Sequence, residues 1–295
     1  MRLLPGILSE RLTWLFCLVS LLAGGATLIL VAVFILREAA PALFADGGLM
    51  ALLFTDPWVP LAEPPLLGIG HAWISTLMIT AISLGVAVPF GYGIGLFISD
   101  VAPTAVRSAL QPCLDVLAGI PSVVYGFFGY VTLVPWFENH FAMATGESIL
   151  AAGLILAVMV LPFIASTSAE AFRAIPGDLR EAALAQGVTR WHAVRRVVVA
   201  QAAPGMFAAA ALGLARAIGE TLAVLMLAGN SVALPHSVLD RGQPLTALIA
   251  TELGEAGVGS PKYHTLFAAA FVLIFVVVCI NALVWAWKGR LIYRV

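Results

Sequence analysis

Long runs without a single charged side chain dominate this sequence. The stretch from Leu12 to Leu36 is uncharged throughout, and similar runs recur at 71–99, 148–169 and 263–287. A helix that crosses the hydrocarbon core of a bilayer, about 30 Å thick, needs about 20 mostly apolar residues. Because 61% of the residues are hydrophobic and only 11% are charged, one soluble core could not hide so much apolar surface. Lipid must therefore surround much of the protein.

These runs predict an all-α membrane protein with six transmembrane helices. Two further apolar runs carry a few charges, namely Asp115 in the third and Arg216 and Glu220 in the fifth. The first run is too long for the apolar segment of a signal peptide, which has roughly 7–15 residues, so we expect it to remain as an anchor. The predicted spans cover residues 12–36, 71–99, 109–137, 148–169, 204–232 and 263–287.

The Lys and Arg residues indicate how the chain is oriented. With the N-terminus inside, eleven of the fifteen fall on the cytoplasmic side, three fall in external loops, and Arg216 lies within a span. Cytoplasmic loops are enriched in these residues, so both termini are expected in the cytoplasm. We predict one transmembrane domain over residues 1–295, with the first helix and an external loop in 1–70 and a five-helix core in 71–287. The core contains the long cytoplasmic loop 170–203.

The two external loops differ in composition. Residues 37–70 contain five prolines, and proline interrupts both helices and central strands, so this loop is predicted to be irregular. In the second loop, 231–262, the segment from Leu245 to Leu253 is predicted to form a short helix at the membrane face.

Composition and motifs exclude several functional classes. The net charge of −1 provides no basic surface for nucleic acid. The three cysteines are far apart, so apolar packing is expected for them rather than a metal site or disulfide; they are Cys17, Cys113 and Cys279. No Gly-x4-Gly-Lys-Ser/Thr motif occurs, so the chain is not expected to hydrolyse ATP itself. No bound metal or cofactor and no enzymatic activity are predicted.

The cytoplasmic loop has the pattern of two short helices joined by a glycine. Asp178 can cap the first helix, with Glu181 reaching back from three residues further on, and Thr189 can cap the second. Gly187 stands where a left-handed residue would end the first helix. Small side chains on that helix, which would suit a tight groove, are Ala182, Ala183 and Ala185. Two interpretations are open at this point: a helix that docks on a partner, and a surface helix that lies against the protein's own base.

The segment Glu181-Ala-Ala-x-x-x-Gly187 resembles the EAA loop of ABC-importer permeases. In that family a short coupling helix sits in a cleft of the ATPase subunit. The family pattern continues with nine residues and then an apolar-x-apolar-Pro element; here Ala200 takes the place of that proline, and Pro204 follows later. The resemblance implies that the residues that couple to the ATPase are Glu181, Ala182, Ala183 and Gly187.

Three further segments are similar to permeases of the phosphate-uptake (Pst) family. They are Leu117–Gly126, Leu161–Ile164 and Gly213–Val224. Sulfate and molybdate permeases share an Arg-Ala-x-Gly-Glu element with the last segment, but the continuation Glu-Thr-Leu-Ala-Val resembles the phosphate branch. Over residues 70–290 the chain is similar to the PstC type of this family rather than the PstA type.

This resemblance implies a fold, a location and a set of partners. The fold would be that of a type I ABC-importer permease in a bacterial plasma (inner) membrane, with lipid around it. The partners would be a second permease of the PstA type, two copies of an ATP-binding subunit that hold ATP and Mg, and an external phosphate-binding protein.

Two charges inside the fifth predicted span are the candidate substrate-pathway residues. Arg216 and Glu220 are four positions apart, which places them on one face of a continuous helix. A charge near the bilayer centre is costly, so it normally faces a cavity and is paired. Arg216 would bind an oxyanion through its planar fork, and Glu220 would hold Arg216 until substrate arrives. A purely structural ion pair is the alternative.

The third predicted span has a helix-breaking centre. Gly119 and Pro121 predict a kink there and a candidate gate. Asp115, shortly before it, could cap a local helix, sit at the cytoplasmic interface or pair with an arginine. In the second span, Gly91 and Gly95 are expected to allow close helix packing.

Together these features predict a permease subunit of an ATP-driven importer of inorganic phosphate. One alternative is the same architecture importing sulfate, molybdate or phosphonate. Another is an ion-coupled secondary transporter in which the Arg–Glu pair relays protons. A secondary transporter has no use for an EAA-type loop, so the loop favours the importer.

Overall fold

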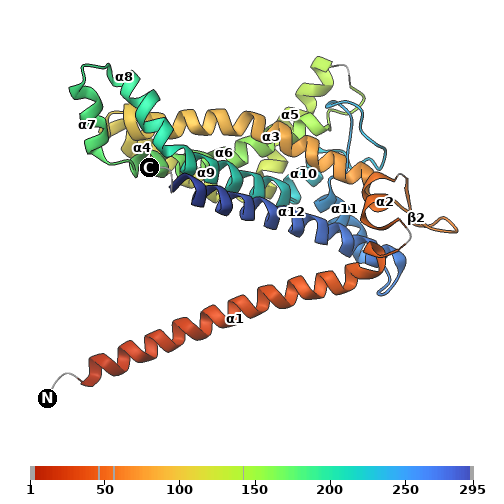
Figure 1. Cartoon of the computed structure of the whole chain (residues 1–295). Coiled ribbons are helices and arrows are strands. Elements are labelled where there is room, and N and C mark those ends of the chain that lie inside the picture. The colour runs from red at the N-terminus through yellow and green to blue at the C-terminus, as the bar shows by residue number, and fades with distance from the viewer. Residues whose placement is uncertain (1–3, 46, 56, 142, 293–295) are drawn as a thin grey trace.

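The computed structural model describes residues 4–45, 47–55, 57–141 and 143–292, which are almost entirely helical (Figure 1). The helices are α1 (Leu4–Leu43), α2 (Gly48–Phe54), α3 (Gly70–Leu96), α4 (Thr104–Gly119), α5 (Ser122–Phe141), α6 (Ile149–Arg173), α7 (Gly177–Ala185), α8 (Arg190–Ala193), α9 (Val199–Gly219), α10 (Leu222–Leu227), α11 (Leu245–Glu252) and α12 (Pro261–Ile292). Two π-helical turns, η1 (Phe97–Val101) and η2 (Val194–Val198), and a 3-10 turn, η3 (Leu253–Glu255), extend α3, α8 and α11.

Within the described residues, five helices are long and apolar enough to cross a membrane. They are Glu10–Leu43, Gly70–Val101, Ile149–Arg173, Arg190–Gly219 and Pro261–Val284. The pair α4 and α5 makes a sixth only when both are counted together, because the chain bends there by 90°. The all-α fold is therefore confirmed, and the break predicted at Gly119 and Pro121 divides the third span, predicted over 109–137, into two helices.

The bend between α4 and α5 has a local cause. Pro121 disfavours a helical conformation in the residue before it, and Ile120 is extended, with φ −66° and ψ 129°. The hydroxyl of Tyr125 donates to the carbonyl oxygen of Leu117 at 2.8 Å, so a side chain from α5 contacts the main chain of α4 across the bend. The predicted kink is thus a full change of direction.

The fifth span begins and ends earlier than the predicted 204–232. Its helix starts at Arg190 and continues through η2 and α9 to Gly219. Glu220 is extended, with φ −71° and ψ 134°, and its carbonyl oxygen accepts the hydroxyl of Thr246 at 2.7 Å. Two features explain why the helix ends here. Gly219 is a poor helix former, and the hydroxyl of Thr246 satisfies the carbonyl oxygen of Glu220, which would otherwise accept an N–H within a continuing helix. The cytoplasmic loop is therefore shorter than the predicted 170–203, because α6 extends to Arg173 and the next long helix already begins at Arg190.

The loop predicted to be irregular at 37–70 contains regular elements. The end of α1, helix α2 and a hairpin of β1 (Trp58–Val59) and β2 (Leu66–Leu67) lie within it. The antiparallel strands pair Trp58 with Leu67. The helix predicted at 245–253 is present as α11, and its Leu245 and Leu248 are fully buried against α3 and α12.

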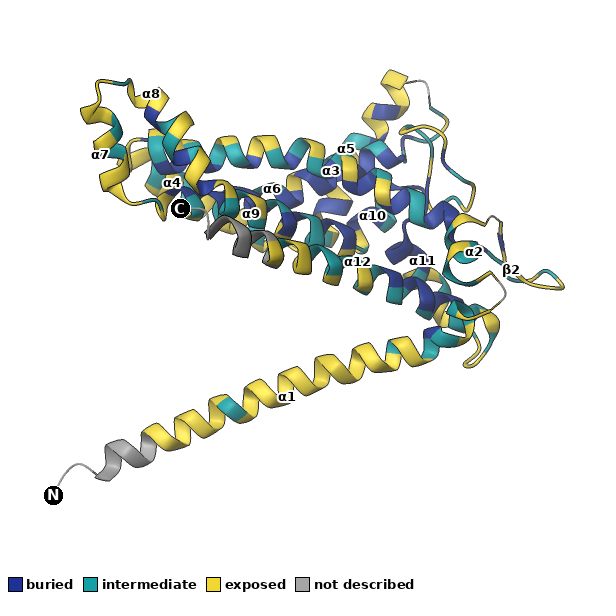
Figure 2. Cartoon of the chain, in the orientation of Figure 1, coloured by how far each residue is buried: buried dark blue, intermediate teal, exposed yellow. Residues whose placement is uncertain are grey.

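Helix α6 lies at the centre of the bundle (Figures 1 and 2). In its most apolar stretch, 67% of the residues of α6 are buried inside the chain, whereas none is buried in the corresponding stretch of α1. Helix α3 approaches it closely at two glycines: a Cβ on Gly95 would lie 2.9 Å from the carbonyl oxygen of Ala165, and one on Gly91 would lie 2.7 Å from Cγ2 of Ile164. The close packing predicted for these glycines is confirmed.

Helix α1 diverges from the bundle and is exposed along most of its length (Figure 2). It meets α12 near its own C-terminal end, where the rings of Phe34 and Phe267 pack edge to face with centroids 5.7 Å apart. The start of α1 and the end of α12 point toward the same end of the molecule as α7 and α8 (Figure 1). This arrangement agrees with the predicted placement of both termini and the loop on one side of the membrane.

Candidate functional site

The segment between α6 and α9 forms the two short helices that its sequence predicts. Gly187 ends the first one in the left-handed region, with φ +78°, and donates its N–H to the carbonyl oxygen of Leu184 at 2.9 Å. The hydroxyl of Thr189 accepts the N–H of His192 at 3.3 Å and so caps α8. Both features were expected from the residue types.

The start of α7 differs from its prediction. Pro176 occupies the N-cap position, and no side chain caps the helix. Asp178 lies inside the first turn, so the capping box predicted for Asp178 and Glu181 is wrong. Proline fixes φ and leads the chain into the helix two residues earlier than expected, while a carboxylate in the first turn still complements the helix dipole.

The residues predicted to couple to an ATPase are presented outward. None of the residues of α7 is buried in this chain, and Figure 2 shows the helix protruding beside α8. Of the predicted coupling residues, Ala183 is half-buried and the others are exposed: Glu181, Ala182 and Gly187. The helix therefore does not lie on the protein's own base through a buried apolar face.

Arg180, on the same helix, was not among the predicted site residues. Its Nη2 lies 3.2 Å from Oδ1 of Asp100 and donates to the carbonyl oxygen of Phe172 at 2.8 Å. Asp100 belongs to η1, at the end of α3, and Phe172 belongs to the last turn of α6. No spacing rule joins residues so far apart in the sequence. The available signal was an aspartate that ends a long uncharged run and an arginine directly before the Glu181–Gly187 motif.

Arg216 lies in the last turn of α9, beside α6. Its guanidinium carbon is 3.9 Å from the centroid of the Phe163 ring, and its Nε is buried without a hydrogen-bond partner among the described residues. Within the described part of the chain no ion pair joins Arg216 to Glu220. The predicted pairing over one helical turn is wrong because α9 ends at Gly219.

Glu220 instead caps the helix that follows. Its Oε1 accepts the N–H of Ala223 at 3.3 Å, at the start of α10. It also borders a small cavity of about 10 Å³, roughly the space that one water needs. Hydroxyl groups around that cavity come from Thr76, Thr80 and Thr246.

The predicted gate residues lie at the turn between α4 and α5. Gly119 is the last residue of α4, and Pro121 lies in the break. Asp115 is exposed in the interior of α4, so it caps no helix, and the described residues place no arginine in an ion pair with it. A position at the cytoplasmic interface is the remaining prediction for Asp115.

No group of three or more His, Cys, Asp or Glu side chains could hold a metal ion within the described residues. All three cysteines are free thiols. The expected packing inside the chain is wrong for Cys17 and Cys113, which are exposed, whereas Cys279 is half-buried.

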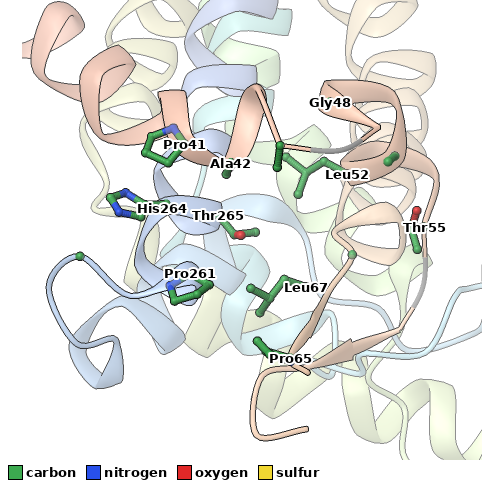
Figure 3. Close-up of a pocket in the computed structure, with 14 residues that line it drawn as sticks. Pro41, Ala42, Gly48, Leu52, Thr55, Pro65, Leu67, Pro261, His264 and Thr265 are labelled. Atoms are coloured by element: carbon green, nitrogen blue, oxygen red, sulfur yellow. The ribbon is translucent and has the colours of Figure 1, made fainter. Parts of the chain in front are cut away.

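A cavity of about 490 Å³ (Figure 3) opens beside α2 and the hairpin, at the end of the molecule opposite α7 (Figure 1). Its walls come from the end of α1, from α2, from the β1–β2 hairpin and from the start of α12. Apolar groups dominate it, with Pro41, Leu52 and Leu67 prominent among them, while His264 and Thr265 add polar atoms. Nδ1 of His264 lies 2.7 Å from the carbonyl oxygen of Glu38, which links α12 to α1.

Comparison with known proteins places these features in one family. The sequence profile of the family described as "binding-protein-dependent transport system inner membrane component" matches residues 87–294. A probable ABC transporter permease protein, YqgH of Bacillus subtilis, is 40% identical over 217 residues, which cover 74% of this chain and 70% of that protein. The phosphate transport system permease protein PstC of Haemophilus influenzae is 33% identical over 231 residues, 70% of this chain and 71% of that protein.

Solved structures agree with the fold. A permease chain of the MetNI methionine ABC transporter in an inward-facing conformation has a TM-score of 0.61 at 22% identity, covering 78% of this chain and 99% of its own. A chain of a bacterial alginate ABC transporter, in complex with a pentasaccharide-bound periplasmic protein, has a TM-score of 0.65 at 17% identity, covering 98% of both chains. The chain therefore belongs to the binding-protein-dependent transport system inner membrane components, as a PstC-type permease subunit of an ABC importer, a multi-pass plasma-membrane protein that is not an enzyme.

Proposed function

We propose that this permease imports inorganic phosphate. The observation that carries the proposal is the guanidinium of Arg216, which stacks on Phe163 and has no carboxylate partner among the described residues. A guanidinium held in this way keeps its charge and offers parallel N–H donors to an oxyanion. Relatives named as phosphate transport permeases support phosphate as that anion.

Energy would come from a separate ATPase that docks on α7. The outward face of this helix and the left-handed Gly187 at its end support a docking role. ATP binding would close two copies of the ATPase, move α7 and tip the spans to the outward-open state, and hydrolysis would reset them. ATP and Mg would be held by that partner and not by this chain.

The remaining partners would complete the pathway. A second permease of the PstA type would form the other half of the pore. The exposed α1 would contact that permease or the surrounding lipid. An external phosphate-binding protein would deliver phosphate at the end that carries α2, the hairpin and the cavity of Figure 3.

The test is uptake by the complex reconstituted into vesicles, with labelled phosphate or labelled sulfate and with or without the binding protein. We expect phosphate uptake that requires ATP and the binding protein, and little sulfate uptake. Sulfate uptake equal to that of phosphate would reassign the substrate. Phosphate uptake that follows an ion gradient without ATP would instead identify a secondary transporter.

A further inference from the structure

Two π-helical turns border the same cavity at the α7 end of the molecule. This cavity, of about 240 Å³, is lined by Ser99 and Asp100 of η1, by Arg180 of α7, and by Val194 and Val198 of η2. In η1 the N–H of Ala102 reaches back five residues to the carbonyl oxygen of Phe97 at 2.7 Å. Single π-helical turns are rare and often mark functional sites. Here one of them ends α3 and the other lies between α8 and α9.

The buried carboxylate in this cavity is held from two sides. Only 4% of the Asp100 side chain is exposed, and Oδ2 accepts the hydroxyl of Ser99 at 2.5 Å, while Oδ1 lies 3.2 Å from Nη2 of Arg180. Nη2 of Arg107 donates to the carbonyl oxygen of Ser99 at 2.8 Å. A buried charge is stable only when it is paired and hydrogen-bonded, so the geometry of η1 and the position of Arg180 depend on each other.

Arg180 connects three elements, of which only α6 and α7 are consecutive in the chain. It belongs to α7, it contacts Asp100 at the end of α3, and it donates to the carbonyl oxygen of Phe172 in the last turn of α6. A carbonyl in the last turn of a helix lacks a partner within that helix, and a cation there complements the helix dipole. The α7 helix is thus fixed to α3 and to α6 through one side chain, although none of its own residues is buried.

We propose that Asp100 and Arg180 are positioning residues that transmit the movement of α7 to α3. The proposal rests on the proposed function, in which an ATPase docks on α7. Helix α7 is joined to α6 by the short segment before it, whereas its link to the end of α3 is the Asp100–Arg180 pair. Because α3 and α6 pack closely at Gly91 and Gly95, a displacement of α7 that reaches both helices would move them as one unit.

The variants Asp100→Asn and Arg180→Gln, alone and combined, test this inference in the complete complex. The measurements are copurification of the ATPase, thermal unfolding, and labelled inorganic phosphate taken up per ATP hydrolysed. We expect the ATPase to copurify at the wild-type level, whereas phosphate per ATP falls at least about fivefold, the lower end of typical coupling energies. The double variant should be no worse than either single one, because both remove the same interaction.

Arg173→Gln is the matched control. Arg173 lies at the same end of α6 and hydrogen-bonds Gln111 and the carbonyl oxygen of Ala169 rather than Asp100, so we expect phosphate per ATP to stay unchanged. Arg180→Lys, which keeps the charge, should recover part of the loss. An unchanged ratio in Asp100→Asn, an equal loss in Arg173→Gln, or single effects that multiply in the double variant would each overturn the inference.

The two proposals can fail separately. If the wild-type complex neither retains an ATPase nor takes up phosphate, the proposed function is wrong and the inference falls with it. If the wild type transports phosphate with ATP and the Asp100 and Arg180 variants couple normally, only the inference is wrong.

Discussion

The guanidinium carbon of Arg216 lies 3.9 Å from the centroid of the Phe163 ring. Arg216 lies in the last turn of α9 and Phe163 belongs to the central α6, so the cation stands on an aromatic face that α6 presents to α9. Such a contact contributes roughly 0.5–2 kcal/mol, depending on how far the pair is desolvated. The ring positions the charge and leaves the N–H donors of the guanidinium unused, whereas a carboxylate partner would occupy them. The N–H groups of Arg216 are therefore available to an anion.

Arg216→Lys should lower phosphate uptake about tenfold or more while the complex still assembles. Lysine keeps the charge but loses both the flat contact with Phe163 and the paired donors, and one charge-assisted hydrogen bond contributes about 1.5–3 kcal/mol. Labelled phosphate uptake by reconstituted vesicles measures the effect. Arg241→Lys is the control, because Arg241 donates to the carbonyl oxygen of Gly229 in a loop. The complex that carries this variant should transport phosphate normally. Wild-type uptake by Arg216→Lys would exclude Arg216 as the anion ligand.

Glu220→Gln and Glu220→Ala should differ in stability. Glutamine keeps an oxygen that can accept the N–H of Ala223, so α10 remains capped and the yield of complex stays near wild type. Alanine removes the cap, at about 1 kcal/mol, so the thermal unfolding temperature and the yield should fall. If Glu220 were instead the counter-ion of Arg216, both variants would impair assembly equally. Thermal unfolding of the purified complex distinguishes the two outcomes.

The elements that were predicted correctly depend on local patterns. The run 148–169 matches α6 because its apolar length reflects the thickness of the bilayer, and the hydroxyl of Ser148 caps the helix by accepting the N–H of Ala151 at 3.1 Å. Gly187 and Thr189 were located by the residue types that helix ends require. In each case the residues that determine a helix boundary lie within a few positions of that boundary in the sequence.

The features that were missed depend on contacts between distant segments. The end of α9 at Gly219 is stabilised by the hydroxyl of Thr246, which no local pattern connects to Glu220. The pair Asp100 and Arg180 likewise forms only because the ends of α3 and α6 lie close to the first half of α7. Hydropathy identified the apolar segments, but a break inside a span changes which side chains share a face. The Arg216–Glu220 pairing failed for that reason.

Asp240 should make the loop before α11 sensitive to acid. The main-chain N–H groups of His236 and Ser237 each donate to its Oδ2 at 2.8 Å, and these bonds lower the pKa of the carboxyl below 3.8. A depressed pKa in the folded protein stabilises it above the unfolded pKa, and this contribution disappears as the pH falls through the folded pKa. Thermal unfolding of wild type and Asp240→Asn should therefore differ slightly at pH 7 and converge once the pH has fallen through the lowered pKa of Asp240. An equal difference at both pH values would contradict this origin.

Gly187→Val should uncouple the ATPase without preventing membrane insertion. A left-handed conformation costs a side-chain-bearing residue roughly 1–2 kcal/mol, and a β-branched residue tolerates it least. Since a Cβ at Gly187 would meet no atom within 4 Å, the effect comes from the backbone alone. Gly187→Asn should be milder, because asparagine visits this region. The readout is ATPase activity stimulated by the loaded binding protein, with phosphate binding to that protein as an internal check.

Gly177→Ala controls for the Gly187 variant in the same loop. Gly177 opens α7 and a Cβ there also meets no atom within 4 Å, but its backbone is not in the left-handed region. Stimulated ATPase activity should match the wild type. Normal stimulation in Gly187→Val would count heavily against a coupling role for this turn.

Gly95→Ala should destabilise the protein by about 1–3 kcal/mol, as overpacking of a closely packed site does. The added Cβ would lie 2.9 Å from the carbonyl oxygen of Ala165 and 3.0 Å from the N of Ala169, and main-chain atoms of α6 cannot move aside as a flexible side chain can. Gly93→Ala, two residues away on α3, adds the same methyl group where no atom lies within 4 Å. That variant should be neutral or slightly stabilising, since alanine favours helix over glycine. Thermal unfolding of the two purified variants therefore compares identical chemistry on two faces of one helix. Equal unfolding temperatures would mean that α3 and α6 do not pack this closely in the membrane.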